Sequence, residues 1–222
     1  VIESVNVHED IKLGLPSRDQ YIENYKKTIK NLKEIGIKVI CYNFMPVFDW
    51  TRTSLDRKLP DGSNTMSYDQ TIIDKITDPQ KFADEIQNQT GGFEMAGWEP
   101  ARMAELKKLF KAYEQVSHEK LKENLKYFLE AIIPVCEACD IKMAMHPDDP
   151  PWDIFGLPRI ANSKETFDEI LSLVDSPYNS ITLCTGSLGS NPQNCLPELI
   201  RYFGRKERIA FAHVRNLKIE EP

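Results

Sequence analysis

Three short hydrophobic segments of this chain each end on a residue that can bind a metal ion. They are Ile141–His146, Ile181–Cys184 and Ile209–His213, and their composition predicts strands. Each interval between them contains one amphipathic helical pattern, which is the rhythm of successive βα units. In a parallel barrel the carboxyl ends of the strands converge on one face. The spacing therefore predicts that the three terminal residues meet around one ion.

A mixed set of imidazole and thiolate ligands suits Mn²⁺, Fe²⁺ or Zn²⁺. Such an ion would act as a Lewis acid that polarises a substrate oxygen or stabilises a leaving hydroxide. A mononuclear site usually has a further ligand, often a carboxylate. The chain has three aspartates in a proline-rich loop after the first ligand, and we interpret them as a rim of the site: Asp148, Asp149 and Asp153. We therefore expect the fourth ligand beyond Pro222.

Four further polar residues are candidates for contacting a substrate. Arg52 and Arg215 are candidate anion clamps, because a guanidinium can hold a carboxylate through two hydrogen bonds. The alternative for each arginine is a surface ion pair. Asn43 ends a predicted strand and can either donate to a substrate hydroxyl or cap a turn. His8 follows the first predicted strand, and it either reaches the site or starts the next loop.

The elements that must position these residues alternate between strands and helices. Two more strands are predicted, at Val1–Val5 and Ile37–Phe44. Apolar residues at helical spacing and capping residues predict the helices. These helices are Asp19–Ile35, two helices within Pro100–Cys139 of which the second starts near Ser117, one from Asn162 or Ser163 to about Val174, and Pro197–Phe203.

Two connections differ from ordinary short loops. Residues 47–100 form a long insertion after the second strand, either a lid over the site or a small subdomain, with a short helix at Phe82–Ile86. We favour the lid, because active-site loops of a barrel arise at this end of a strand. The segment Thr185–Ser190 is rich in glycine and serine and is predicted to be a loop.

The repeated βα units predict an α/β fold with parallel strands and right-handed crossovers. A doubly wound sheet and a (β/α)8 TIM barrel both fit this order. No nucleotide-binding fingerprint supports the doubly wound sheet, and converging ligands favour the barrel. Because side chains alternate along a strand, the ligands would face the barrel mouth and their neighbours the helices. We interpret residues 1–222 as one partial barrel domain, an interior piece of a longer protein.

Composition limits the class of function. The 222 residues carry a net charge of −6, which disfavours nucleic-acid binding. The chain has no apolar run long enough for a membrane span, so no membrane partner is expected. An odd count of five cysteines favours reduced thiols and a cytoplasmic location. The Cys136-Glu-Ala-Cys139 pair lies in a helical pattern, and we interpret it as structural.

Five segments together resemble the D-mannonate dehydratase family. They cover nearly the whole chain: Val1-Ile-Glu-Ser with Val-His-Glu-Asp10, Cys41-Tyr-Asn-Phe-Met-Pro-Val-Phe-Asp-Trp-Thr-Arg52, Met145-His-Pro-Asp-Asp-Pro-Pro-Trp152, Leu183-Cys-Thr-Gly-Ser-Leu-Gly189 and Ala212-His-Val-Arg-Asn216. The resemblance implies a xylose-isomerase-like TIM barrel of which this chain holds the middle five βα units, without the first two strands and the last.

The same resemblance implies an activity and a set of ligands. The expected reaction is dehydration of D-mannonate to 2-keto-3-deoxy-D-gluconate with Mn²⁺ or Fe²⁺, in the catabolism of glucuronate. The expected metal ligands are His146, Cys184 and His213. The family's fourth ligand, an Asp in a Pro-Asp-His motif, and its catalytic residues are expected downstream of Pro222. A cytoplasmic homo-oligomer, a dimer, is the expected assembly.

Two rival interpretations remain open from the sequence. One is a sugar isomerase or epimerase on the same barrel, although such enzymes tend to use carboxylate-rich, paired metal sites. The other is a truncated piece that keeps the fold and has no activity, because an open sheet of five strands exposes two edges. We expect the 222-residue chain alone to be inactive or unstable.

Overall fold

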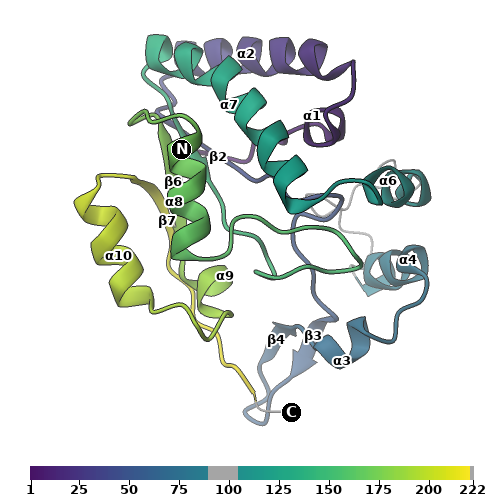
Figure 1. Ribbon diagram of the computed structural model, residues 1–222. Coiled ribbons are helices and arrows are strands. Elements are labelled where there is room, and N and C mark those ends of the chain that lie inside the picture. Colours follow the sequence, from purple (N-terminus) through teal and green to yellow (C-terminus); the bar gives the residue numbers. More distant parts are fainter. Residues whose placement is uncertain (90–104, 221–222) are drawn as a thin grey trace.

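A five-stranded parallel sheet is the centre of the computed structural model, which describes residues 1–89 and 105–220 (Figure 1). The sheet order is β1-β2-β5-β6-β7, so strands that follow one another in this sheet along the chain are also neighbours in space. The strands are β1 (Ile2–Glu3), β2 (Val39–Tyr42), β5 (Lys142–Met145), β6 (Asn179–Cys184) and β7 (Ile209–His213). The five predicted strands are confirmed, with bounds that differ by a few residues. The fold is α/β with a parallel half-barrel sheet.

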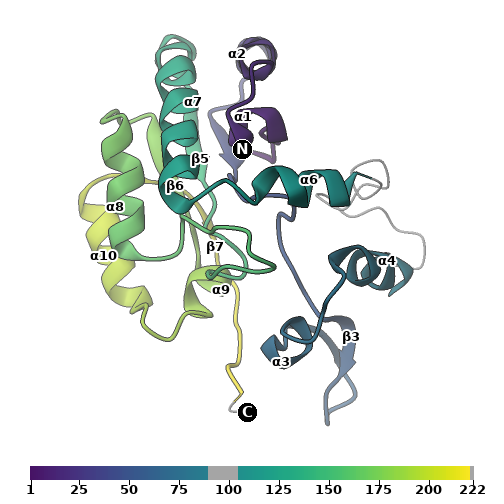
Figure 2. The same ribbon diagram turned by 45° about the vertical axis from the view of Figure 1, so that its right-hand side comes forward.

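Helices cover one face of this sheet (Figures 1 and 2). The covering helices are α2 (Arg18–Glu34), α7 (His118–Cys139), α8 (Lys164–Leu173) and α10 (Leu196–Arg205). The strand residues that face them share one hydrophobic cluster with the helices, for example Ile40, Met143, Ile181 and, from α7, Phe128. Alternation along the strands thus directs large apolar side chains toward the helices, as predicted.

Small and polar side chains occupy the opposite face of the sheet. Cys41, Ala144 and Thr182 are all buried there. The hydroxyl of Thr182 donates to the carbonyl oxygen of Ala144 at 3.1 Å and lies 3.3 Å from the sulfur of Cys41. This inner face leads along the strands to the carboxyl edge, where the predicted metal ligands lie.

Local capping explains where the long helices begin and end. The side chain of Ser117 accepts a hydrogen bond from the backbone N–H of Lys120 at the start of α7. Asp140 ends that helix in the left-handed conformation, with φ 55°. A capping box between Ser163 and Thr166 starts α8. The two predicted helices within 100–139 are present, since α6 (Leu106–Tyr113) precedes α7.

The insertion contains regular structure where it is described. A hairpin of β3 (Ser54–Lys58) and β4 (Asn64–Ser67) is followed by α3 (Gln70–Ile73) and α4 (Pro79–Gln89), which includes the predicted short helix. Its buried residues form a second hydrophobic cluster with α6 and the loop after β5: Val47, Phe48, Ile73, Phe82, Ile86, Leu106, Tyr113, Ile154 and Leu157. Residues 90–100 of the insertion lie outside the described residues.

The prediction of a loop at Thr185–Ser190 is wrong. The segment forms α9 (Thr185–Gly189), which begins directly after β6. Cys184 is its N-cap, and its sulfur accepts a hydrogen bond from the backbone N–H of Ser187. Both glycines of the segment adopt ordinary negative φ angles, and the backbone N–H of Ser190 donates to carbonyls of the preceding turn. A cap from the strand end therefore outweighs the loop propensity of glycine and serine.

A second short helix, α1 (Glu9–Leu13), follows β1.

In the part of the chain that the structure describes, no helix combines the length and the apolar character needed to cross a bilayer.

Candidate metal centre

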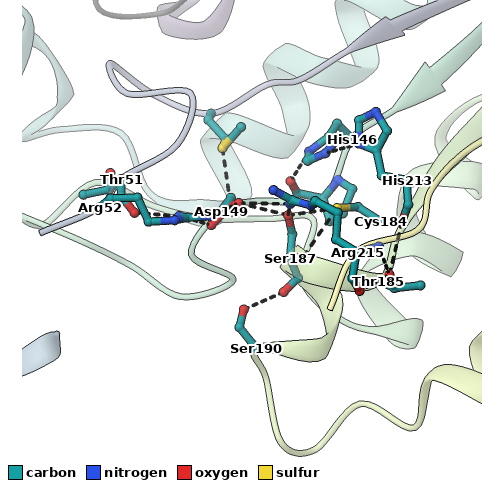
Figure 3. Close-up of polar contacts among 12 residues, drawn as sticks. Thr51, Arg52, His146, Asp149, Cys184, Thr185, Ser187, Ser190, His213 and Arg215 are labelled. Carbon is teal, nitrogen blue, oxygen red and sulfur yellow. Dashed lines mark hydrogen bonds and ion pairs between the residues drawn. The ribbon is translucent and has the colours of Figure 1, made fainter. Parts of the chain in front are cut away.

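The three predicted ligands come together at the carboxyl edge of the sheet. His146 follows β5, while Cys184 and His213 are the last residues of β6 and β7 and lie opposite each other in the register of these strands. One ligand atom from each of the three residues lies within 4.8 Å of the other two (Figure 3). The structure thus brings together three residues that are far apart in sequence.

Hydrogen bonds fix the orientation of both imidazole rings. Nδ1 of His146 lies 2.7 Å from the carbonyl oxygen of Pro147, so Nδ1 donates its hydrogen there and Nε2 is the nitrogen that faces the cluster. Nε2 of His213 lies 2.8 Å from a carboxylate oxygen of Glu3, which likewise directs the lone pair of Nδ1 toward the cluster. Metal-binding histidines commonly have such partners on the far nitrogen.

The two inward nitrogens have a spacing that suits a shared ion. His146 Nε2 and His213 Nδ1 are 3.2 Å apart, and two lone pairs at this distance require a proton or a cation between or beside them. Nitrogens bound to one ion at about 2.1 Å, with an angle of about 90–110° between the bonds, are separated by about 3.0–3.4 Å. The residues present therefore fit a mononuclear metal.

Cys184 has the properties of a metal-binding thiolate. Burial works to raise its pKa, but the hydrogen bond and positive charge of His146, together with hydrogen bonds from Ser187, lower it to about 5. The guanidinium of Arg215 also donates to the sulfur at 3.0 Å. The thiolate is the form of cysteine that binds metals, so these neighbours favour the form of Cys184 that a metal would need.

Asp149 joins both candidate arginines. Arg52 donates to its two carboxylate oxygens at 2.7 and 3.0 Å, and Ser187 donates to Oδ2 at 3.1 Å. Nη2 of Arg215 lies 3.5 Å from the same Oδ2. Burial would raise the pKa of Asp149, but the hydrogen bonds and charges of the arginines hold the pKa below its usual value. In Figure 3, Arg52 approaches Asp149 from one side, and Ser187 and Arg215 approach from the other.

The remaining candidates have different surroundings. Asn43 lines the cavity, and its side-chain oxygen accepts from the backbone N–H of Met45 at 3.1 Å, which is the turn-capping role considered from the sequence. His8 is the N-cap of α1, and its ring stacks on Tyr21 with centroids 3.5 Å apart. His8 is not among the described residues that line the cavity.

A cavity of about 630 Å³ lies beside the three ligands. This volume is typical of small-molecule sites. Its polar lining combines carboxylate, amide, imidazole and guanidinium groups: Glu3, Asn43, Asp49, Arg52, His146, Asp149, His213 and Arg215. The site can therefore hold a small anionic, hydroxylated molecule next to the ligand cluster.

Three of these lining residues were missed or misplaced from the sequence. The rim interpretation does not hold for Asp149, which is buried and lies inside the cavity wall; Asp148 instead accepts from the backbone N–H of Ala161, and Asp153 pairs with His118. Glu3 and Asp49 were not considered. Glu3 is the last residue of β1, but the strand predicted from the sequence ran from Val1 to Val5 and placed Glu3 in its middle, so the end-of-strand signal that identified the histidines did not point to it.

The fold and the site define an α/β protein with a half-barrel sheet and a cluster of potential metal ligands at the carboxyl edge of its strands. A family model described as D-mannonate dehydratase (UxuA) matches residues 1–222. A mannonate dehydratase from Thermotoga neapolitana is 63% identical over 218 residues, 98% of this chain and 60% of that protein. One from Geobacillus thermodenitrificans is 56% identical over 219 residues, 99% of this chain and 59% of that protein.

A solved structure gives the same result. The crystal structure of mannonate dehydratase from Streptococcus suis serotype 2 is 43% identical in sequence and superimposes with a TM-score of 0.83, covering 96% of this chain and 55% of that chain. The chain belongs to the D-mannonate dehydratase family. It spans about 60% of the length of the curated relatives it matches.

Proposed function

We propose that the native protein containing this chain dehydrates D-mannonate to 2-keto-3-deoxy-D-gluconate, with Mn²⁺ or Fe²⁺ as cofactor. The observation that carries this proposal is the convergence of His146, Cys184 and His213 beside a cavity with two arginines, in a member of this family. A carboxylate substrate matches the arginines, and its hydroxyl groups match the polar lining.

The reaction removes a proton from C2 and a hydroxide from C3, so that one water leaves and the resulting enol becomes the 2-keto acid. When bound, the metal supplies Lewis-acid stabilisation of negative charge on a substrate oxygen. His146, Cys184 and His213 would hold it, and Glu3 and the Pro147 carbonyl keep the two rings turned inward. Positive charge at Arg215 offsets the charge that develops on the substrate carboxylate when the C2 proton is removed.

We also propose that the half-barrel sheet is part of a complete (β/α)8 barrel. β1 and β7 are the two edges of the sheet, yet Glu3 of β1 and His213 of β7 are in contact at 2.8 Å. In a flat sheet, strands four positions apart would be separated by about 19 Å, four spacings of about 4.8 Å. Such strong curvature supports closure into a barrel.

The expected cellular setting and assembly follow from the same proposal. All five cysteines are unpaired, and four are buried, which supports a reducing compartment such as the cytoplasm. A homodimer is the expected assembly, and sedimentation of the native protein measures it.

Metal content and turnover test the proposal. The native protein is purified with Mn²⁺ or Fe²⁺, its metal is quantified, and release of 2-keto-3-deoxy-D-gluconate from D-mannonate is followed by mass spectrometry. We expect Cys184→Ser to lose most metal and turnover. Cys195→Ser, which changes an exposed cysteine, is the matched control and should retain both. Metal binding without dehydration would reject the substrate, and an isomeric product of unchanged mass would favour an isomerase or epimerase.

A further inference from the structure

Asp149 lies where four segments that follow strands meet. Its backbone carbonyl accepts from the N–H of Thr51 at 3.1 Å, and its side chain holds Arg52, so it is attached twice to the insertion that follows β2. Asp149 itself follows β5. Its carboxylate also contacts Ser187, in α9 after β6, and Arg215, after β7.

The two arginines have different freedom in this arrangement. Both Nη atoms of Arg52 are bound to Asp149, and its side chain is 16% exposed. Arg215 is 42% exposed, and its side-chain contacts with described residues all use Nη2. Nε and Nη1 of Arg215 are therefore the guanidinium donors left to receive an anion in the cavity. Arg52 instead donates its Nη hydrogens to the carboxylate of Asp149.

Close contacts with α9 restrict the position of Arg215. The hydroxyl of Thr185 contacts both the backbone N–H and the carbonyl of Arg215, each at 2.7 Å. The guanidinium lies flat against Gly186, where a Cβ would approach Nε to 2.7 Å. Nη2 also contacts Cys184, Ser187 and Asp149.

We propose that Asp149 is a positioning residue: by holding Arg52 and Arg215 on one buried carboxylate, it sets Arg215 in the orientation that binds the carboxylate group of a sugar acid. The inference rests on the proposed function, because the ligand is the substrate of that reaction. Without the negative charge of Asp149, the two neighbouring guanidinium groups repel each other and lose their shared acceptor. Repulsion would displace Arg215, the less buried of the two.

The opposite outcome is equally specific. If Asp149 only balanced charge, its replacement by a neutral residue would leave the cavity more positive. The cavity would then bind an anion more tightly. The direction of the change in affinity for D-mannonate therefore separates positioning from simple charge balance.

The test uses the native, metal-loaded protein with Asp149→Asn, Arg52→Lys and the control Asp175→Asn. The control removes the ion pair between Asp175 and Arg208, neither of which is among the described residues that line the cavity. Binding of D-mannonate is measured by calorimetry, and KM and kcat by product release. We expect Asp149→Asn to weaken binding and raise KM by about 10- to 100-fold, with metal content retained and a smaller change in kcat.

Arg52→Lys provides a variant that keeps the charge and removes the two-point pair with Asp149. Like Asp149→Asn, this variant should raise KM, and it should remain folded even if Asp149→Asn does not. In the double variant, Arg52→Lys should add little to Asp149→Asn, because Arg52 acts through Asp149.

Each outcome decides between the two proposals. Unchanged or tighter binding of D-mannonate by folded Asp149→Asn, or unchanged KM in Arg52→Lys, overturns the positioning role while leaving the dehydratase intact. Binding without turnover in the wild type rejects the reaction, and the variant affinities still test Asp149. Absence of D-mannonate binding by the wild type rejects both.

Discussion

Glu3 and His213 connect the first and last strands of the sheet through a 2.8 Å contact between a carboxylate oxygen and Nε2. This contact turns the opposite nitrogen of His213 toward His146 and Cys184. The first strand thus contributes to the candidate metal centre without providing one of its three ligands.

Replacement of Glu3 by Gln should weaken metal binding by about 10-fold, because a partner on the far nitrogen orients a ligating imidazole and increases its basicity. Metal titration of the native protein measures the dissociation constant. Glu220→Gln, which changes an exposed glutamate paired with Arg57, is the control. Equal metal affinity in the two variants would show that the Glu3 contact does not support the ligand.

Gly186→Ala should displace the side chain of Arg215 and leave the fold largely unchanged. Its Cβ would lie 2.7 Å from Nε of Arg215, so the guanidinium must move. We expect KM for D-mannonate to rise by about 10-fold or more. The matched control is Gly204→Ala in α10, where a Cβ meets nothing within 4 Å. That control should gain about 0.5–1 kcal/mol of stability from helix propensity and keep its KM. Similar KM values in both variants would contradict the placement of Arg215.

The Cys136 and Cys139 pair should not react with alkylating agents in the folded protein. Both thiols are buried, and burial raises the pKa of Cys136 to about 12. Since the thiolate is the reactive form, its population stays low from pH 7 to about pH 10. Labelling with iodoacetamide followed by mass spectrometry should modify the exposed Cys195 first. Modification of Cys136 at the same rate as Cys195 would exclude the structural role inferred from the sequence.

Phe128 is a central residue of the main hydrophobic cluster. It is fully buried on α7 and contacts three aromatic rings, those of Tyr25, Tyr42 and Phe44. Phe128→Ala should reduce the free energy of unfolding by about 3–5 kcal/mol through lost burial and a cavity. Denaturant unfolding of the native protein measures the change. Tyr127→Phe at the exposed neighbouring position should cost less than about 1 kcal/mol, and a similar loss in both would contradict the packing described.

Strand ends were predictable from the sequence because a local signal encodes them. Runs of β-branched and apolar residues locate the strands, and the parallel βα order then brings His146, Cys184 and His213 to one edge. No local signal could identify Asp149 as the partner of Arg52, because the two residues are 97 positions apart and meet only through the tertiary fold.

Helix α9 and His8 also show what the sequence could not predict, here among residues that are close in the chain. The glycine and serine content of 185–190 is typical of a loop, and the cap that converts it into a helix comes from the sulfur of Cys184. For His8 the sequence left two possibilities, and the structure shows the ring acting as the cap of α1. In both cases a side chain just before the segment determines the backbone conformation.

The sulfur of Cys184 both begins α9 and belongs to the ligand cluster, and the next residues of that helix hold Arg215 in place. In the proposed site, metal preference and anion recognition would therefore be linked through one atom, and replacing it would change both unless the new side chain can also cap a helix. Serine, a strong N-cap but a poor ligand for soft metals, would separate the two properties, whereas alanine would remove both. Engineering a different metal into this family should begin from residues that cap as well as ligate.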